Sequence, residues 1–181
     1  TDAGAMVWSE STARSGAITV GARSILVAYN VNVEEKGALV SKKIGSIVRS
    51  SGRLLKSTNG GKIRSKGMLQ KVQGMGVPVD ELGISQVSMN LLDVDICPLH
   101  LAFKTCESLA ADHNIALCGS EIVGLVPLNA MLEAGRYFLP EAVNDDEKVD
   151  AAIEGLGLNT HHEFDPELHI IEWALAKEVG A

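Results

Sequence analysis

The feature that most constrains the fold is a strict alternation of side chains in residues 24–33. A period of two is typical of a β-strand, so the apolar set predicts a core face: Ile25, Val27, Tyr29, Val31 and Val33. The opposite face is only half apolar: Leu26, Ala28, Asn30 and Asn32. A solvated sheet surface favours Thr, Lys and Glu, whereas neutral amides suit a surface that meets a ligand or another polar surface. The strand therefore predicts a core on one side and a binding surface on the other.

The remaining periodicities predict three more strands and several helices. The core pattern consists of a helix over 34–49, strands over 68–79 and 84–92, a helix over 98–114 and a strand over 115–126. Helices over 128–139, 145–155 and 165–177 follow this pattern. We also expect the tip of a hairpin at residues 57–61 and an irregular entry segment over residues 1–15. Gly74 and Gly76 indicate a bulge or a close approach to another element. The order predicts an α+β fold, a ferredoxin-like βαββαβ sandwich with additional C-terminal helices.

In this topology one sheet face stays open, and the first and third predicted strands are neighbours. We expect Asn30 and Asn32 to lie across from Gln86, Ser88 and Asn90. Leu69, Lys71, Gln73 and Met75 would share a face of the next strand outward. A one-residue slip in register would exchange the two faces. The pattern predicts an open face rich in amides.

Charge is concentrated in one segment of an otherwise acidic chain. Ten of the 16 Lys and Arg residues lie in residues 36–71, where there is no acid, while the formal net charge of the chain is −7. Such a segment is typical of a surface that binds an anion, or of a solvated basic loop. No aromatic residue lies between Tyr29 and Phe103 to stack on bases, so a carboxylate-bearing small molecule fits better than nucleic acid.

Composition bounds the class of protein. A chain of 181 residues with 46% hydrophobic content can form one compact core. No apolar run approaches the roughly 20 residues of a membrane span, so we expect no membrane partner. Cys97, Cys106 and Cys118 have neither disulfide nor zinc spacing, which predicts buried thiols in a reduced cytoplasmic compartment. His161 and His162 have no further ligand spaced with them and read as a solvated loop, so no metal site is expected.

Several motifs, taken in order, resemble one family. The chain opens with Thr-Asp-Ala-Gly, and Ser-Gly-Ala at 15–17 and Gly-Ala-Arg at 21–23 lead into Leu-Val-Ala-Tyr-Asn-Val-Asn at 26–32. Lys-Val-Gln-Gly-Met-Gly at 71–76, Gln-Val-Ser-Met-Asn-Leu at 86–91, Gly-Ser-Glu-Ile-Val-Gly-Leu-Val-Pro at 119–127 and Ala-Gly-Arg-Tyr-Phe at 134–138 follow. The ordered set resembles the C-terminal subdomain of glutamate formimidoyltransferases. Nearly the whole chain is covered.

The resemblance implies an enzyme of histidine degradation that moves a formimidoyl group between N-formimidoyl-L-glutamate and tetrahydrofolate. It implies two ferredoxin-like subdomains whose open sheets face each other around the folate. The family's folate-contacting segment matches residues 4–16. Together with the amide-rich face, this predicts a folate site composed of Gly4, Ser15, Gly16, Ala17, Arg23, Asn30, Asn32, Lys71, Gln73, Gln86 and Asn90. We expect Lys71 and one of Arg64 or Lys66 to bind the glutamate tail of the folate.

The family's catalytic histidine is absent from this sequence. It lies in a His-Pro-Arg-type motif of the N-terminal subdomain, and no segment here matches that motif. The resemblance therefore implies that residues 1–15 are an entry segment, that residues 16–181 are the C-terminal subdomain, and that the N-terminal subdomain is a required partner. We expect the chain alone to be inactive and to form a homo-oligomer. The competing hypothesis is a non-catalytic ferredoxin-like module that binds a small molecule or self-associates through its open sheet.

Overall fold

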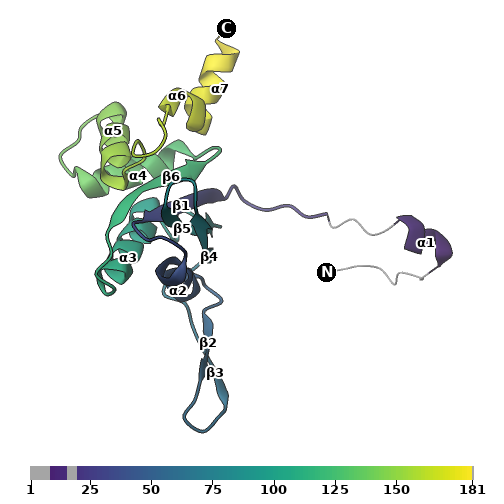
Figure 1. Cartoon of the computed structure of the whole chain (residues 1–181). Helices are drawn as coiled ribbons and strands as arrows, with labels where there is room; N and C mark the ends of the chain where they lie inside the picture. Colours follow the sequence, from purple (N-terminus) through teal and green to yellow (C-terminus); the bar gives the residue numbers. More distant parts are fainter. Residues whose placement is uncertain (1–8, 16–19, 181) are drawn as a thin grey trace.

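The computed structural model describes residues 9–15 and 20–180 (Figure 1). Its main sheet consists of β1 (Val27–Val33), β4 (Val72–Val79), β5 (Ile84–Leu91) and β6 (Leu117–Val123). The strands lie in the order β4-β5-β1-β6, and every neighbouring pair is antiparallel. The α+β class and the predicted pairing of the first strand with the third are thus confirmed, since Asn30 lies opposite Ser88 and Asn32 opposite Gln86.

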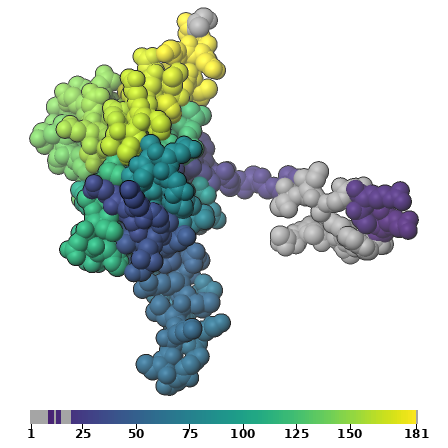
Figure 2. Space-filling view, viewed as in Figure 1, coloured from purple at the N-terminus to yellow at the C-terminus, as the bar shows by residue number. Residues whose placement is uncertain are grey.

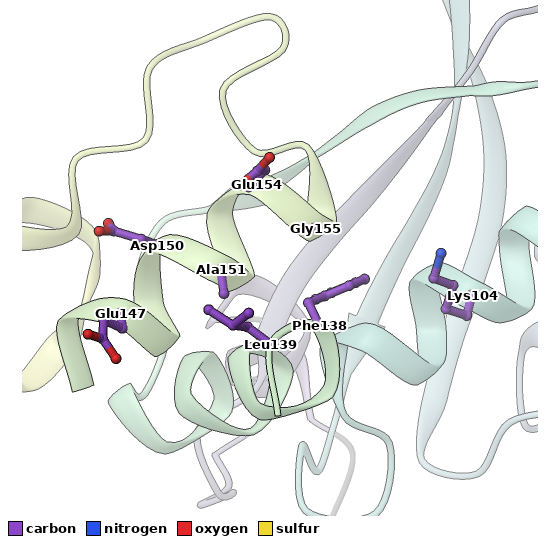
Figure 3. A pocket seen from close by; sticks show the side chains of 8 residues that line it. All are labelled: Lys104, Phe138, Leu139, Glu147, Asp150, Ala151, Glu154 and Gly155. Atoms are coloured by element: carbon purple, nitrogen blue, oxygen red, sulfur yellow. The ribbon is translucent and has the colours of Figure 1, made fainter. Parts of the chain in front are cut away.

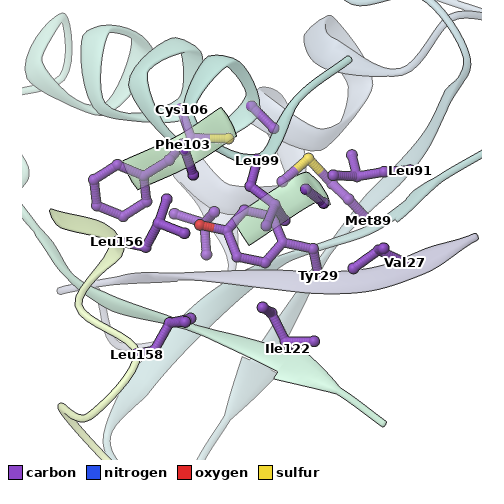
Figure 4. Packing of buried hydrophobic residues seen from close by; sticks show 14 of the residues in the cluster. Val27, Tyr29, Met89, Leu91, Leu99, Phe103, Cys106, Ile122, Leu156 and Leu158 are labelled. Atoms are coloured by element: carbon purple, nitrogen blue, oxygen red, sulfur yellow. The ribbon is translucent and has the colours of Figure 1, made fainter. Parts of the chain in front are cut away.

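Helices α2 (Leu39–Val48) and α3 (Leu99–Ala111) connect the strands and cover one face of the sheet (Figure 1). The core lies between these helices and the sheet. It contains the fully buried side chains that the alternation predicts: Val27, Tyr29, Val31 and Val33. Figure 4 shows Tyr29 beneath α3, among aliphatic side chains. Its hydroxyl donates a hydrogen bond of 2.9 Å to Ser120 Oγ, which in turn donates to the carbonyl oxygen of Leu156 at 2.7 Å.

Helix α2 begins later than the sequence predicts, at Leu39 rather than residue 34. The reason is a cap from outside the helix. The Glu35 carboxylate accepts hydrogen bonds from the backbone N–H groups of Val40 (2.8 Å) and Ser41 (3.3 Å), and from the hydroxyl of Ser85 (3.0 Å). Burial alone would raise the pKa of Glu35, but these hydrogen bonds hold it below its ordinary value. The acid predicted inside the helix therefore satisfies its free N-terminal donors.

The two glycines of β4 allow a close approach to α2, as predicted. A Cβ on Gly76 would overlap the backbone of Ser41 and Lys42. A Cβ on Gly74 would lie 3.1 Å from the carbonyl oxygen of Gly45 in the helix. Only glycine permits this separation, which places α2 directly on the edge strand.

Several predicted boundaries are wrong. The second predicted strand begins at Val72 because Lys71 adopts a left-handed backbone (φ 55°), and Leu69 is buried rather than sharing a face with Gln73. Ile25 precedes β1 and is 59% exposed. The entry segment is not wholly irregular, since it contains the helix α1 (Glu10–Ser15).

Two additions extend the βαββαβ core. The predicted hairpin forms from β2 (Arg53–Lys56) and β3 (Lys62–Ser65) and projects from the body (Figures 1 and 2). After β6 come α4 (Leu128–Phe138), α5 (Asp145–Leu156), α6 (Pro166–His169) and α7 (Ile171–Val179). The single helix predicted over 165–177 is interrupted at Ile170, where the backbone is extended and bridges to Val126.

Candidate functional site

The face of the sheet opposite α2 and α3 carries most of the predicted site residues. The cross-strand register places these side chains together on what we call the open face: Ala28, Asn30, Asn32, Gln73, Met75, Val77, Gln86, Ser88, Asn90, Glu121 and Val123. Met75 is 60% exposed and Val123 is 50% exposed, so the face is open at these two positions, whereas Asn32 is only 2% exposed. The predicted clustering of amides on one side of the sheet is confirmed.

The amides of the open face form a network around one carboxylate. Gln86 Nε2 donates to Asn32 Oδ1 at 2.9 Å and to Glu121 Oε2 at 3.3 Å. Asn30 Nδ2 donates to the same Glu121 oxygen at 3.4 Å. No cation among the described residues forms a salt bridge with Glu121. Its second oxygen therefore keeps the capacity to accept from N–H donors of a ligand.

A second pair of amides lies toward the edge strand. Asn90 Nδ2 donates to Gln73 Oε1 at 3.3 Å. Each of these amides keeps further donor or acceptor capacity, because a primary amide offers two N–H groups and a carbonyl oxygen. The open face thus presents donors and acceptors to an adjoining molecule without a net positive charge.

A cleft of about 460 Å³ adjoins this edge. Its lining includes Lys71 and Gln73, both predicted, and Arg49, which sequence reasoning missed because it follows the last residue of α2. The Arg64 guanidinium donates to the carbonyl oxygen of Ser51, another lining residue, at 3.0 Å. The cleft is therefore lined by two cations, Arg49 and Lys71, and Arg64 is bonded to its wall, an arrangement that suits a carboxylate group.

His161 and His162 lie at the other end of the open face. Both are exposed, as predicted for a loop, but they also line a small cavity with Asn32, Gln86 and Glu121. Its volume of about 20 Å³ is close to that of one water molecule. The sequence contained no signal for this placement, because it depends on how the chain returns over Gly119 after α5.

Two further predicted residues, Arg23 and Ser15, precede β1 and are not part of the open face. Arg23 lies in an exposed segment before β1, where its guanidinium donates to the neighbouring Ser24 carbonyl oxygen at 3.4 Å. Ser15 is the last residue of α1. Gly4, Gly16 and Ala17 lie outside the described residues.

The other titratable candidates have structural surroundings. His100 stacks on Tyr137 with ring centroids 4.5 Å apart, and burial lowers its pKa. Burial raises the pKa of Cys97 to about 11 and that of Cys106 to about 12, while Cys118 is only half-buried. Within residues 9–15 and 20–180, no three His, Cys, Asp or Glu side chains are grouped as metal ligands would be. No helix in the described part of the chain has the length and apolar character needed to cross a membrane.

Comparison with known proteins places the chain in a family. Residues 28–176 match the family model of the formiminotransferase domain. The chain is 37% identical over 171 residues to a formimidoyltransferase-cyclodeaminase of Dictyostelium discoideum, covering 91% of this chain and 30% of that protein. The mouse formimidoyltransferase-cyclodeaminase is 34% identical over 162 residues, covering 87% of this chain and 28% of that protein.

A monofunctional relative matches as well. The glutamate formimidoyltransferase of Streptococcus pyogenes is 32% identical over 125 residues, covering 69% of this chain and 37% of that protein. The chain thus spans about a third of the length of the curated relatives it matches. The family match covers β1 through most of α7, the whole framework that positions the open face. This chain therefore belongs to the formiminotransferase family, whose members are transferases.

Proposed function

We propose that this chain is the C-terminal, folate-binding half of a glutamate formimidoyltransferase. The enzyme would move a formimidoyl group between N-formimidoyl-L-glutamate and tetrahydrofolate in histidine degradation. In this proposal residues 16–181 form the C-terminal subdomain and residues 1–15 its entry segment. The observation that carries the proposal is the amide network around Glu121 on the open face, in a chain that belongs to this family.

The chemistry of the open face fits the ring system of a folate. That ring has N–H donors together with ring nitrogen and carbonyl acceptors. The Glu121 carboxylate matches the donors, and the amides of Gln86 and Asn90 offer both donors and acceptors. We therefore assign Asn30, Asn32, Gln73, Gln86 and Asn90 to folate binding. Gly4, Ser15, Gly16, Ala17 and Arg23 remain predicted contacts from the entry side.

The cationic cleft fits the other end of a folate. A glutamate tail ends in carboxylates, and the cleft carries Arg49 and Lys71, with Arg64 bonded to its wall. Guanidinium groups bind carboxylates through fixed, often paired hydrogen bonds, whereas an ammonium acts as a point charge. We propose that Lys71, with Arg64 or Lys66, holds the tail. Removing the charge at all three positions would then weaken the binding of folates that carry a glutamate tail.

The open face also has to be covered for catalysis. Transfer at an amidine carbon passes through a tetrahedral intermediate and requires proton movement near neutral pH, which suits a histidine. We propose that a preceding N-terminal subdomain supplies that histidine and closes over the open face. The present residues would then orient the folate and exclude water from it. On this basis the chain alone binds folate but does not catalyse transfer.

Calorimetry with folinic acid tests the binding surface. Asn90→Leu keeps the approximate side-chain volume but removes one amide of the open face, and we expect binding to weaken about 3- to 10-fold, the equivalent of one hydrogen bond. Asn129→Leu is the matched control, since Asn129 is an exposed amide on α4, away from the sheet. Equal affinities for the two variants would contradict the assignment. No binding by a chain that dimerises through its open sheet would instead favour the non-catalytic module.

A further inference from the structure

Two histidines lie beside the carboxylate at the centre of the amide network. His161 and His162 line the cavity of about 20 Å³ together with Glu121. One oxygen of Glu121 accepts hydrogen bonds from the amides of Asn30 and Gln86. No salt bridge among the described residues joins either histidine to this carboxylate. A space close to one water molecule in size therefore separates two imidazoles from the other oxygen of Glu121, which is free to accept.

The segment that carries the histidines is fixed on both sides of them. We call residues 157–164 the histidine loop. Leu158 and Phe164 are buried, at 4% and 7% exposed. The backbone N–H of Ser120 in β6 donates to the carbonyl oxygen of Gly157 at 3.1 Å. The loop thus lies against β6, while the two exposed imidazoles between its buried ends keep the freedom to rotate.

The histidines are the groups through which the charge of this corner changes near neutral pH. Histidine is the side chain whose ordinary change of charge falls between pH 5 and 8. The other polar groups that line the cavity are the neutral Asn32, Gln86 and Ser120, and the charged residue that follows in the loop is the exposed Glu163. No Lys or Arg of the described residues lines the cavity. Protonation of the histidines therefore introduces positive charge where the described lining has none.

A larger groove along α5 lacks this property (Figure 3). Its volume is about 680 Å³, and among the described residues its lining combines Lys104 with Asp150 and Glu154 but includes no histidine. Lys104 is also paired with Glu107 at 2.8 Å. Lysine and carboxylate side chains ordinarily keep their charges between pH 6 and 8. A contact that depends on pH in this range therefore belongs to the small cavity rather than to the groove.

The two charge states of an imidazole act differently on a carboxylate. A neutral ring has one N–H donor and one acceptor nitrogen, whereas an imidazolium has two donors and a positive charge. Protonated rings therefore compete with the N–H groups of a ligand for the free oxygen of Glu121. We propose that His161 and His162 are positioning residues that pair with Glu121 when protonated and withdraw this carboxylate from the folate ring as the pH falls. The pairing itself needs no ligand, but its effect on folate rests on the proposed function of the open face.

The side-chain amide signals of the ligand-free chain test the pairing. The amides of Asn30 and Gln86 donate to Glu121, so their proton–nitrogen NMR signals respond to a new charge at that carboxylate. We expect both signals to move between pH 8 and pH 6. The Gln73–Asn90 pair lies toward the edge strand, and its amide signals stay in place as the internal control.

Matched variants attribute this movement to the histidines. His161→Gln/His162→Gln keeps polar side chains at the cavity but removes the titration, so the signals of Asn30 and Gln86 no longer move. His113→Gln removes an exposed histidine in the turn after α3, and the movement persists. Signals that stay fixed in the wild type would overturn the proposal, as would equal movement in the double variant.

Calorimetry with folinic acid measures the consequence for the ligand. Between pH 8 and pH 6 we expect the dissociation constant of the wild-type chain to rise about 2- to 5-fold more than that of His161→Gln/His162→Gln, the range for a partly exposed ion pair. An equal rise in both proteins would refute the withdrawal of Glu121 from the ligand. An absence of folinic acid binding at both pH values would instead refute the proposed function, and the amide signals would still decide whether the pairing forms.

Discussion

The hydrogen bonds that join Tyr29, Ser120 and Leu156 couple the central strand to β6 and to the end of α5. Tyr29 is fully buried and Ser120 is 3% exposed. Tyr29→Phe removes one buried hydrogen bond but leaves no buried donor unpaired, so we expect a loss of about 1 kcal/mol in the free energy of unfolding. Ser120→Ala leaves the tyrosine hydroxyl without its acceptor and the Leu156 carbonyl without its donor. We expect that variant to lose about 2–3 kcal/mol.

The double variant tests the coupling. Once Tyr29 is replaced by Phe, Ser120→Ala no longer leaves a buried hydroxyl without its acceptor. The free energy of unfolding lost by the double variant is therefore about 1 kcal/mol smaller than the sum of the single losses. Urea unfolding followed by circular dichroism measures all three values. Tyr137→Phe is the matched control, because Tyr137 is 50% exposed and its hydroxyl has no hydrogen bond within the described residues. We expect the free energy of unfolding of this variant to equal that of the wild type. Strictly additive losses would refute the shared network.

The same burial predicts a titration result. Desolvation raises the pKa of Tyr29 well above its ordinary value, more than the hydrogen bond to Ser120 lowers it. The sequence contains two tyrosines. In the Tyr137→Phe variant, where Tyr29 is the tyrosine that remains, an absorbance titration therefore detects no ionisation while the chain stays folded. Tyr29 ionises only as the chain unfolds, and its reversible ionisation below the unfolding transition would contradict its burial.

Three further predictions concern the framework. Glu35→Gln lowers the free energy of unfolding by about 1 kcal/mol at pH 7, as loss of a helix cap does. Because the pKa of Glu35 is depressed in the folded chain, this difference shrinks as the pH falls through that pKa, and a difference in urea midpoints that does not change as the solution is acidified would contradict the cap. Gly76→Ala costs roughly 1–3 kcal/mol because its Cβ meets helix backbone, whereas Gly61→Ala, with open space around it, has little effect on the melting temperature. Cys118 reacts with a thiol reagent in the folded chain before the fully buried Cys106, and the opposite order would contradict the packing of α3.

The two faces of the sheet were predictable because they depend on local alternation. Tyr29 and Asn30 fall on opposite sides of β1 wherever the strand begins, and the topology then aligns Asn32 with Gln86. The close approach at Gly74 and Gly76 was predictable for a similar reason, because glycine inside a strand usually marks a bulge or a site where another backbone comes close. What the sequence could not indicate was the identity of the neighbouring element, which is α2.

The misplaced boundaries and overlooked residues share a different cause. Helix α2 starts at Leu39 because Glu35, outside the helix, folds back to cap it and is held by Ser85 from another strand. Arg49 and the pair His161–His162 reach the open face or its edge only through packing between distant segments. Such contacts leave no periodic trace in the sequence. Long-range side-chain contacts therefore set both the helix start and the outer parts of the candidate site.

The central claim is that the open face forms one wall of a folate-dependent transfer site. Its most direct test joins this chain to the N-terminal part of the glutamate formimidoyltransferase of Streptococcus pyogenes and measures turnover. We predict transfer that requires both N-formimidoyl-L-glutamate and tetrahydrofolate, a lower kcat/KM for Asn90→Leu than for the Asn129→Leu control, and no turnover by the chain alone. A folded, joined protein without turnover, or full activity in the Asn90→Leu variant, would contradict the claim.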